Sequence, residues 1–483
     1  MGEPSNNQDA LEARIPPSCP ASISQILTQA WNHDLASLKP LLDVPGRASV
    51  QEPTTGETPL HASIRSCGPG AAASDLKAAE GVLEELFFNG AIWNDVDSNN
   101  ETPGCVAARL GQAELYDMCV GAGVRAELLF GLLEGYEELE SMDEDDNEDE
   151  EVVDMTSDAA APDGEEVPDL VETNNEGHAT EKQPKKTEQE KEEEEEEETE
   201  ILESNPDRAF VAPSAAEAQA SQVDSAEYLR SNLTYSAGKL TDDAANGVMM
   251  EWETSIMRAS VDTLLPEQQP GRKVLNIGFG MGIIDGMFAA TKPARHHIIE
   301  AHPDVLSHIA TSPDCQFGPA WEASAPEQGA YKVHAGKWQD VVPKLLEAGE
   351  TYDAVYFDTF GEDYAQLRMF FTEHVPGLLE EEGRFGFFNG LGADRQICYD
   401  VYTKVVEMHL SDAGMDVAWQ EMDVDMQGLQ EEGKGEWEGV KRRYWTLNSE
   451  YSYLLVLLNP PFLISENANE HVSQNTGFQL ALS

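Results

Sequence analysis

The sequence is poor in features that define several large classes of protein. Its six cysteines form no CxxC pair and no spacing typical of metal ligands, so we expect reduced thiols in an intracellular protein, cytoplasmic and nuclear, without a bound metal. A membrane-spanning helix needs about 20 consecutive apolar residues. The most apolar run, residues 453–464, is shorter and is interrupted by Asn459, Pro460 and Pro461. The sequence therefore predicts no membrane span.

Basic residues are also scarce. The chain holds 30 Lys and Arg against 91 Asp and Glu, which gives a net charge of −61. Residues 137–203 alone contain 31 acidic residues and 4 lysines, and the rest of the chain is still acidic. Such a field repels phosphate groups and attracts cations. The charge balance therefore excludes nucleic acid as a direct partner and favours a basic protein.

The first of three segments, residues 20–136, is rich in Ala and Leu and has helical patterns. It contains two helix starts of the same kind, Thr58-Pro59 and Thr102-Pro103. A turn, a Thr-Pro start, a short helix pair and a Gly-Ala end resemble ankyrin repeats. The two starts are 44 residues apart, against a usual period of about 33, and an insertion near 66–75 accounts for the excess. The repeats either cap the neighbouring domain or bind a partner.

The second segment, residues 137–205, is acidic and has few large apolar residues. Its like charges repel one another, and it cannot bury enough apolar surface to form a core. We therefore predict a disordered linker, with a docking arm for a basic partner as the alternative.

The third segment, residues 220–483, alternates strand and helix patterns, which is typical of α/β folds. Parallel strands joined by helices form an open, doubly wound, Rossmann-like sheet that binds ligands at the carboxyl ends of its strands. The predicted strands are 273–277, 297–300, 331–334, 354–357, 384–388, 417–424 and 443–447, and the predicted helices are 283–290, 367–379 and 397–410.

A glycine-rich turn follows the first of these strands. Gly278, Gly280 and Gly282 allow the backbone to approach a ligand closely. Glu300 ends the second strand, 20 residues after Gly280, where a carboxylate can accept hydrogen bonds from both hydroxyls of a ribose. The turn departs from the GxGxxG spacing, and the sequence contains neither a Walker lysine nor an arginine placed for a 2′-phosphate. We therefore expect a nucleoside cofactor other than ATP or NADP.

Several motifs in this segment resemble guanidinoacetate N-methyltransferase in order and spacing. They are Gly278-Phe279-Gly280-Met281, Ile298-Ile299-Glu300, Gly336-Lys337-Trp338, Tyr356-Phe357-Asp358-Thr359 and, upstream, residues 248–254 with Met257. A longer match, which adds 360–364 and 388–395, resembles the fungal arginine δ-nitrogen (type IV) protein methyltransferases, whose N-terminal region is also ankyrin-like. The resemblance covers residues 220–447. It implies a class I methyltransferase domain with S-adenosyl-L-methionine as its cofactor.

The resemblance also implies which residues bind that cofactor. Glu300 would hold the ribose, Trp338 and Gln339 would lie along the adenine, and Tyr235 would be a stacking lid. The glycine turn would surround the methionine end, and two methionines of the preceding helix would line the pocket. The full implied set is Tyr235, Met249, Met257, Met281, Gly282, Ile283, Ile284, Asp285, Gly286, Glu300, Ala301, His302, Trp338, Gln339 and Asp358.

Glu253 and Asp358 are the catalytic carboxylates that the resemblance implies, with Glu253 on the helix before the glycine turn. A guanidinium stays protonated, with a pKa above ~12, and its lone pairs are delocalised. Paired carboxylates can bind its planar fork, concentrate electron density on one nitrogen and accept the proton of that nitrogen.

The implied substrate is an arginine side chain in a protein, methylated on the δ nitrogen that carries the carbon chain. The family precedent is a large-subunit ribosomal protein, and we expect a monomer that acts on such a basic partner. Two alternatives remain: a small-molecule guanidino methyltransferase of the guanidinoacetate type, and a non-enzymatic ankyrin-type scaffold. The tail, residues 448–483, matches neither family.

Overall fold

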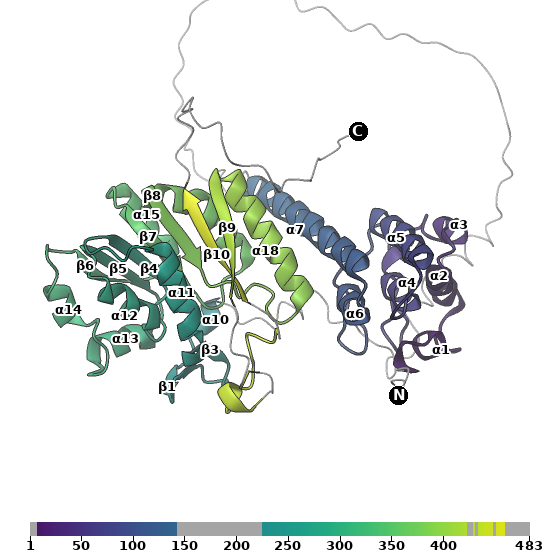
Figure 1. The fold of residues 1–483 in the computed structure, drawn as a ribbon, viewed down its shortest axis with the longest axis horizontal. Coiled ribbons are helices and arrows are strands. Elements are labelled where there is room, and N and C mark those ends of the chain that lie inside the picture. The colour runs from purple at the N-terminus through teal and green to yellow at the C-terminus, as the bar shows by residue number, and fades with distance from the viewer. Residues whose placement is uncertain (1–6, 143–224, 423–427, 430–432, 448–450, 459–483) are drawn as a thin grey trace, which may run out of the picture.

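An N-terminal unit of helices lies beside a C-terminal α/β unit in the computed structural model (Figure 1). Two long helices, α7 (Ala113–Met142) and α18 (Gln396–Asp412), lie between the two units. The structure describes residues 7–142, 225–422, 428–429, 433–447 and 451–458. Most of the predicted linker and the end of the tail lie outside the described residues. Among the described helices, none is long and apolar enough to cross a membrane.

The C-terminal unit is built on a seven-stranded sheet in the order β6-β5-β4-β7-β8-β10-β9. The first five strands in this order are parallel, and β10 is antiparallel to both of its neighbours. This confirms the expected open, doubly wound, Rossmann-like α/β sheet. The strands are β4 (Lys273–Ile277), β5 (Arg295–Glu300), β6 (Tyr331–Ala335), β7 (Tyr352–Phe357), β8 (Leu379–Phe387), β9 (Met415–Met422) and β10 (Tyr451–Leu458).

The last strand differs from the prediction. Residues 443–447 are not a strand, and the strand that completes the sheet is β10, inside the tail that matched neither family. Trp445 and Leu447 are both buried against aromatic side chains, and this burial produced an alternation that resembled a strand. A continuous apolar run such as that of β10 suits a strand that is paired on both sides.

Helices cover both faces of the sheet because alternate residues of a strand point to opposite sides. On one face, Val274, Ala354 and Tyr356 pack with α11 and α12. On the other face, Leu275 and Phe357 pack with α15 and α18. The helices of this unit are α10 (Ser225–Tyr228), α11 (Thr254–Leu264), α12 (Ile283–Ala290), α13 (Pro303–Thr311), α14 (Pro319–Ala323), α15 (Trp338–Glu347), α16 (Tyr364–Met369), α17 (Val375–Leu378) and α18.

The predicted helix at 367–379 is present as α16, a π-helical turn at Phe370–His374 and α17. The predicted helix around Met249 and Glu253 begins later than expected. Met249 lies on a strand, Glu253 ends a 3-10 turn, and α11 starts only at Thr254. That strand belongs to a small sheet that sequence patterns did not predict, formed by β1 (Thr234–Ser236), β2 (Lys239–Thr241) and β3 (Gly247–Met250).

The N-terminal unit consists of helices, and both Thr-Pro pairs begin one. Thr58 accepts a hydrogen bond from the backbone of His61, and Thr102 accepts one from the backbone of Cys105, as N-cap residues do. Helix α7 continues to Met142, beyond the predicted end of this unit at 136. The ankyrin-like assignment itself stays a prediction. The helices are α1 (Leu11–Arg14), α2 (Ala21–Trp31), α3 (Leu35–Leu38), α4 (Pro59–Ser66), α5 (Ala73–Phe88), α6 (Pro103–Leu110) and α7.

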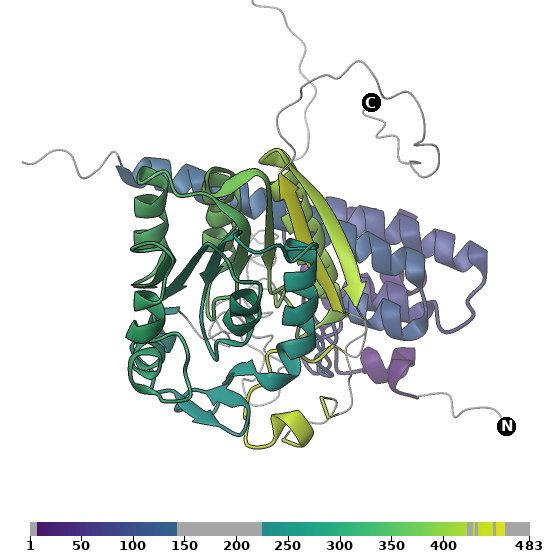
Figure 2. The same cartoon turned by 60° about the vertical axis from the view of Figure 1, so that its left-hand side comes forward.

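The two units share one hydrophobic core. Ile397, Val401 and Val405 of α18 belong to the same buried cluster as the N-terminal helices, and α7 lies along α18 (Figure 2). The packing is tight at Gly104, where an added Cβ would lie 1.9 Å from Cδ1 of Ile397. At Gly123 it would lie 2.6 Å from Cγ2 of Val401. Because apolar cores are close-packed, the N-terminal helices hold α18 in place.

Candidate active site

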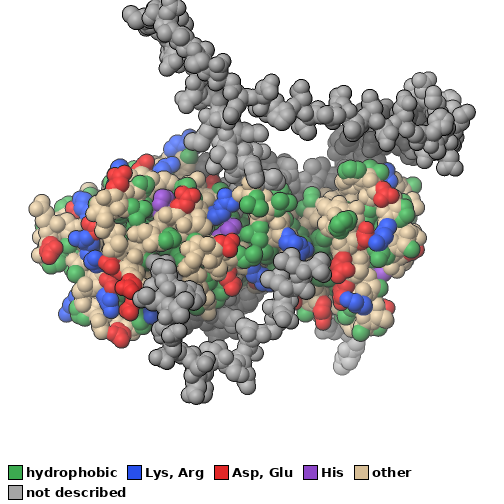
Figure 3. All heavy atoms as spheres, turned by 90° about the horizontal axis from the view of Figure 1, so that it is seen from above, with side chains coloured by type: hydrophobic (Ala, Val, Ile, Leu, Met, Phe, Trp, Pro, Cys, Tyr) green, Lys and Arg blue, Asp and Glu red, His purple; other side chains and the backbone are tan. Residues whose placement is uncertain are grey.

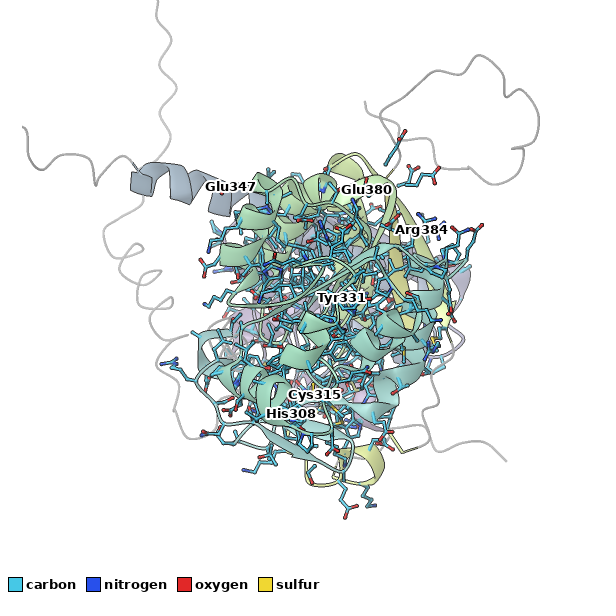
Figure 4. The ribbon with its side chains drawn as sticks, turned by 90° about the vertical axis from the view of Figure 1, so that its left-hand side faces the viewer. His308, Cys315, Tyr331, Glu347, Glu380 and Arg384 are labelled. Atoms are coloured by element: carbon cyan, nitrogen blue, oxygen red, sulfur yellow. The ribbon has the colours of Figure 1, made fainter. Side chains whose placement is uncertain are left out.

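The glycine turn lies where β4, β5 and β7 end. Gly278 has a φ of 93°, and an added Cβ would lie 1.8 Å from the carbonyl oxygen of Asp358. At Gly280 a Cβ would lie 2.6 Å from Sδ of Met249. Gly278 therefore requires glycine, because the backbone of Asp358 leaves no room for a Cβ. At Gly280 the neighbour is the flexible end of the Met249 side chain, and the φ of 54° in the left-handed region favours glycine there. The two ends of the sheet can be told apart in Figure 4, where His308, in the helix after β5, lies far from Glu380 at the start of β8.

Glu300, the predicted ribose ligand, lies against this turn. Its Oε2 accepts a hydrogen bond from the backbone N–H of Phe279 at 2.9 Å, and its Oε1 accepts one from His302 at 2.6 Å. Burial raises the pKa of Glu300, and the backbone N–H donors act in the opposite direction. Each oxygen of an ionised carboxylate has two acceptor positions. Glu300 thus holds the turn through its backbone donors at the strand end where a ribose ligand was predicted.

Tyr235 lies over the same turn from β1. Its hydroxyl donates to the carbonyl of Gly280 at 2.9 Å, and its ring stacks on His308 with 4.1 Å between centroids. Sδ of Met249 lies 3.2 Å from the backbone nitrogen of Met281. Tyr235, Met249 and Met281 therefore lie together at the turn, as the resemblance implied.

Other residues of the implied set face the core. Met257 is fully buried on α11 among the apolar side chains under the sheet, and Ile284 packs there too. Asp285 is fully buried and bonds to Nδ2 of Asn276 at 2.8 Å and to Nε2 of His296 at 2.9 Å. Its carboxylate thus fastens α12 to β4 and β5. Sequence patterns did not predict this network.

Five further implied residues lie in the turn, at the start of α12, or directly after Glu300. Gly282 begins α12 in the left-handed region, with a φ of 71°, ahead of Ile283 and Gly286. Ala301 follows Glu300 directly. The ring of His302 is buried and bonds to the carbonyl of Tyr228 at 3.0 Å, so it joins α10 to this edge of the sheet.

Trp338 and Gln339 begin α15 near the end of β6. Nε1 of Trp338 donates to Glu362 at 3.0 Å, and Nε2 of Gln339 donates to Gln366 at 3.2 Å. The Trp338 ring packs edge-on against Phe357 and is 2% exposed. Nε2 of Gln339 also donates to Glu362, at 3.4 Å, so Glu362 contacts both residues that were predicted to lie along the adenine.

The two predicted catalytic carboxylates come together at this edge. Glu253 is 2% exposed, and its Oε1 accepts bonds from the backbone N–H of Met250 at 2.8 Å and from the hydroxyl of Tyr444. Burial and the nearby charge of Asp358 raise the pKa of Glu253 to about 8. Burial raises the pKa of Asp358 to about 7. Two neighbouring acids whose pKa values are raised, that of Glu253 partly by the charge of Asp358, are suited to binding a cation.

Several buried polar atoms at this edge have no hydrogen-bond partner within the protein. They are Oδ2 of Asp358, Oγ1 of Thr359 and Oε1 of Gln339. Buried polar groups are nearly always paired, so these atoms mark a place for a polar ligand. Together with the glycine turn and Glu300, they fit a nucleoside cofactor beside a guanidinium. Among the described residues, no group of three or more His, Cys, Asp or Glu could hold a metal ion.

The sequence analysis missed two tyrosines. Tyr228, on α10, packs against His302 and Phe360 with centroids 4.8 and 5.1 Å away. Burial raises the pKa of its phenol, and the charges of Glu300 and Asp358 add to this effect. Tyr228 therefore lies near enough to the predicted ribose ligand and to a predicted catalytic carboxylate to be affected by both charges. Tyr444, the second, donates a hydrogen bond to Glu253. No local sequence pattern predicted a role for either tyrosine.

Comparison with known proteins bears on this site. A family model for guanidinoacetate N-methyltransferase matches residues 234–415, which include the glycine turn and both carboxylates. Among solved structures, the chain is similar to the fibrillarin of Aeropyrum pernix in complex with natively bound S-adenosyl-L-methionine. That likeness has a TM-score of 0.28 and 13% identity, and covers 47% of this chain and 82% of that chain.

Relatives match over nearly the full length. Protein arginine N-methyltransferase 2 of Gibberella zeae is 56% identical over 449 residues, 92% of this chain and 94% of that protein. The protein of the same name from Neurospora crassa is 57% identical over 446 residues, 92% of this chain and 97% of that protein. The chain therefore belongs to the family of fungal proteins named protein arginine N-methyltransferase 2.

Proposed function

We propose that this protein methylates the δ nitrogen of an arginine side chain in another protein, and that this substrate is a large-subunit ribosomal protein. S-adenosyl-L-methionine is the methyl donor. The observation that carries the proposal is the pair of carboxylates, buried Glu253 and half-buried Asp358, beside a glycine turn and an acidic strand end suited to a nucleoside. The names of the fungal relatives support arginine methyl transfer as the activity.

The carboxylate pair supplies what a guanidinium needs in order to react. Glu253 and Asp358 attract the cation, and their fork of oxygens matches its planar edge. Once bound, the guanidinium restores the ionised state of both acids, because its positive charge offsets their mutual repulsion. The nitrogen that is methylated loses a proton, and a carboxylate in contact with it can accept that proton. Bound S-adenosyl-L-methionine supplies an already activated methyl group, so positioning does much of the remaining work.

The glycine turn and its neighbours are the residues that would hold the cofactor. Glu300 would accept the ribose hydroxyls, and Tyr235 and Met249 would close the turn from the small sheet. Trp338 and Gln339, oriented through Glu362 and Gln366, would lie along the adenine.

The δ nitrogen is proposed because the catalytic region matches the guanidinoacetate family model. Guanidinoacetate is methylated on the nitrogen that carries its carbon chain, and the corresponding nitrogen of arginine is the δ one. The net charge of −61 supports a basic partner. On the face seen in Figure 3, acidic and basic side chains are interspersed, so this support comes from the whole chain rather than from a patch there. We further propose a monomer located in the cytoplasm and the nucleus.

The test is to incubate the purified protein with labelled S-adenosyl-L-methionine and an extract of cells that lack it. Label in a single small basic protein is expected, and acid hydrolysis should release δ-methylarginine, which fragmentation distinguishes from terminally methylated forms. A parallel reaction with guanidinoacetate tests the second candidate function, small-molecule methylation, which the same family match favours. Label in guanidinoacetate alone, or only in terminal nitrogens, would contradict the proposal.

A further inference from the structure

The hydroxyl of Tyr444 donates a hydrogen bond to Oε1 of Glu253, 191 residues away in the sequence. Burial and the charge of Glu253 raise the pKa of this phenol well above its ordinary value. Tyr444 therefore remains a protonated donor over the whole range in which Glu253 titrates. Its partner oxygen also accepts a bond from the backbone of Met250, so two donors converge on one side of the carboxylate.

The Tyr444 ring is fixed by its neighbours. It stacks on Trp252 at a centroid distance of 6.0 Å and meets Trp437 edge-on at 5.3 Å and Phe388 at 6.5 Å. At Gly247 an added Cβ would lie 3.1 Å from Cε1 of the ring. With aromatic side chains and backbone around it, the ring has little freedom to turn its hydroxyl away.

The chain around Tyr444 is fastened to a loop that follows β8. Thr446 donates from its backbone N–H to the carbonyl of Ala393 at 3.0 Å and from its hydroxyl to the carbonyl of Asp394 at 2.8 Å. Trp445 is buried and packs edge-on against Tyr399 of α18. The position of Tyr444 is thus set by the catalytic unit as a whole rather than by its own segment.

We propose that Tyr444 is a positioning residue for the reaction: it holds the Glu253 side chain in one rotamer, through Oε1, so that the carboxylate meets the guanidinium of the substrate together with Asp358. This inference rests on the proposed function. A donor that binds the ionised carboxylate also favours that form over the protonated one. Tyr444 thereby counteracts the burial and the charge of Asp358, the two causes that raise the pKa of Glu253.

Among the residues that the structure describes, three titratable groups interact with Glu253. They are Tyr356 near the end of β7, Asp358 directly after that strand, and Tyr444 itself. The Asp358 charge acts against ionisation of Glu253, and Tyr356, whose pKa is raised well above its ordinary value by burial, stays neutral. Removing the Tyr444 hydroxyl leaves the Met250 N–H as the remaining donor that the structure shows on Oε1 of Glu253.

The test compares Tyr444→Phe with the full-length wild-type chain. Phenylalanine keeps the ring packing and loses the hydroxyl. Ethylguanidine affinity in the presence of S-adenosylhomocysteine is measured by calorimetry from pH 6 to 9. The pH below which this affinity falls, the acid limb of the profile, should be about one unit higher in Tyr444→Phe than in the wild type. That shift corresponds to the loss of one hydrogen bond to a charged group. Methyl transfer to extract protein at pH 7 should fall at least roughly ten-fold, with S-adenosylhomocysteine affinity changed less than two-fold.

The matched control is Tyr352→Phe. Tyr352 is also a buried tyrosine whose hydroxyl has a side-chain partner, Nδ1 of His297 at 2.8 Å, but it lies at the start of β7, at the far end of the sheet from Asp358. The Tyr352→Phe variant should show the same acid limb of ethylguanidine binding as the wild type. A merely structural role for Tyr444 would lower stability without moving that limb.

The possible outcomes separate the two proposals. Identical pH profiles for wild type and Tyr444→Phe would overturn the role of Tyr444. A wild-type chain that binds ethylguanidine but transfers no methyl group to protein would contradict the proposed function alone, and the binding profile would still decide on Tyr444. A wild-type chain that binds no ethylguanidine would overturn both.

Discussion

Glu300 and Phe279 are joined by a hydrogen bond of 2.9 Å from the backbone N–H of Phe279 to Oε2 of Glu300. The bond ties the end of β5 to the glycine turn after β4. Because the other oxygen of Glu300 accepts from the backbone of His302, the carboxylate organises the turn in addition to its proposed contact with a ribose. The consequences of losing it are therefore larger than the loss of one ligand contact.

Glu300→Gln should weaken S-adenosyl-L-methionine binding about ten-fold or more, measured by calorimetry. The amide places an NH₂ group against one of two backbone N–H donors, and a lost bond to a charged group costs about 1.5–3 kcal/mol. Glu322→Gln is the matched control, since Glu322 also accepts a backbone bond, from Val333 at 2.8 Å, outside the site. Equal affinity for both variants would remove Glu300 from the cofactor site.

Asp358→Asn should still bind cofactor but transfer methyl groups about 10²–10⁴-fold more slowly, because the amide loses both charge and proton-accepting capacity. Glu253→Gln should behave in the same way. The double variant should be less impaired than the product of the single effects, because both groups act on one guanidinium. Single-turnover rates measure this, and near-normal rates in both single variants would refute the catalytic assignment.

The pH dependence of transfer should reflect the raised pKa values of the two acids, about 8 for Glu253 and about 7 for Asp358. A carboxylic acid with a raised pKa is protonated at neutral pH, and the protonated form does not attract a guanidinium. The rate constant kcat/KM should therefore fall as pH decreases through 8 and 7. In Asp358→Asn the remaining acid limb, which reports on Glu253, should move to lower pH, because the pKa of Glu253 falls when the neighbouring negative charge is lost. A profile flat from pH 6 to 9 would exclude this pair from the rate-determining steps.

Gly104→Ala should destabilise the whole protein by about 1–3 kcal/mol, since overpacking a core has costs of that order. The added methyl group would lie 1.9 Å from Cδ1 of Ile397, at the junction of the N-terminal helices with α18. The matched control is Gly81→Ala on α5, where an added Cβ meets nothing within 4 Å. There the higher helix propensity of alanine should increase the free energy of unfolding by about 0.5–1 kcal/mol. Chemical denaturation compares the two, and equal stability would mean that the two units do not share a core.

Deletion of residues 143–203 should leave cofactor affinity unchanged. The sequence predicts that like-charge repulsion in this acid-rich segment opposes a packed core, and we therefore expect the segment to contribute nothing to the cofactor pocket. Calorimetric titration with S-adenosylhomocysteine tests this, and a large loss of affinity would show that the acidic segment contributes to the catalytic unit.

The sequence by itself determined the centre of the site. A short apolar strand, a turn of glycines and an acidic residue at the next strand end are all local patterns, and parallel strands bring their carboxyl ends to one edge. Glu300 and Asp358 were placed correctly for this reason. The limits of β4 and α12 were predicted correctly, because the glycine turn marks where one ends and the other begins.

Only the tertiary structure decided what surrounds that centre. Tyr444 reaches Glu253 across 191 positions, Asp285 turns its carboxylate to Asn276 and His296, and β10 enters the sheet between β8 and β9. These contacts join residues of different elements, from 9 to 191 positions apart, that share no period, so no local pattern encodes them. They depend on which buried donor lies beside which buried acceptor, and the packing of the whole chain determines that pairing.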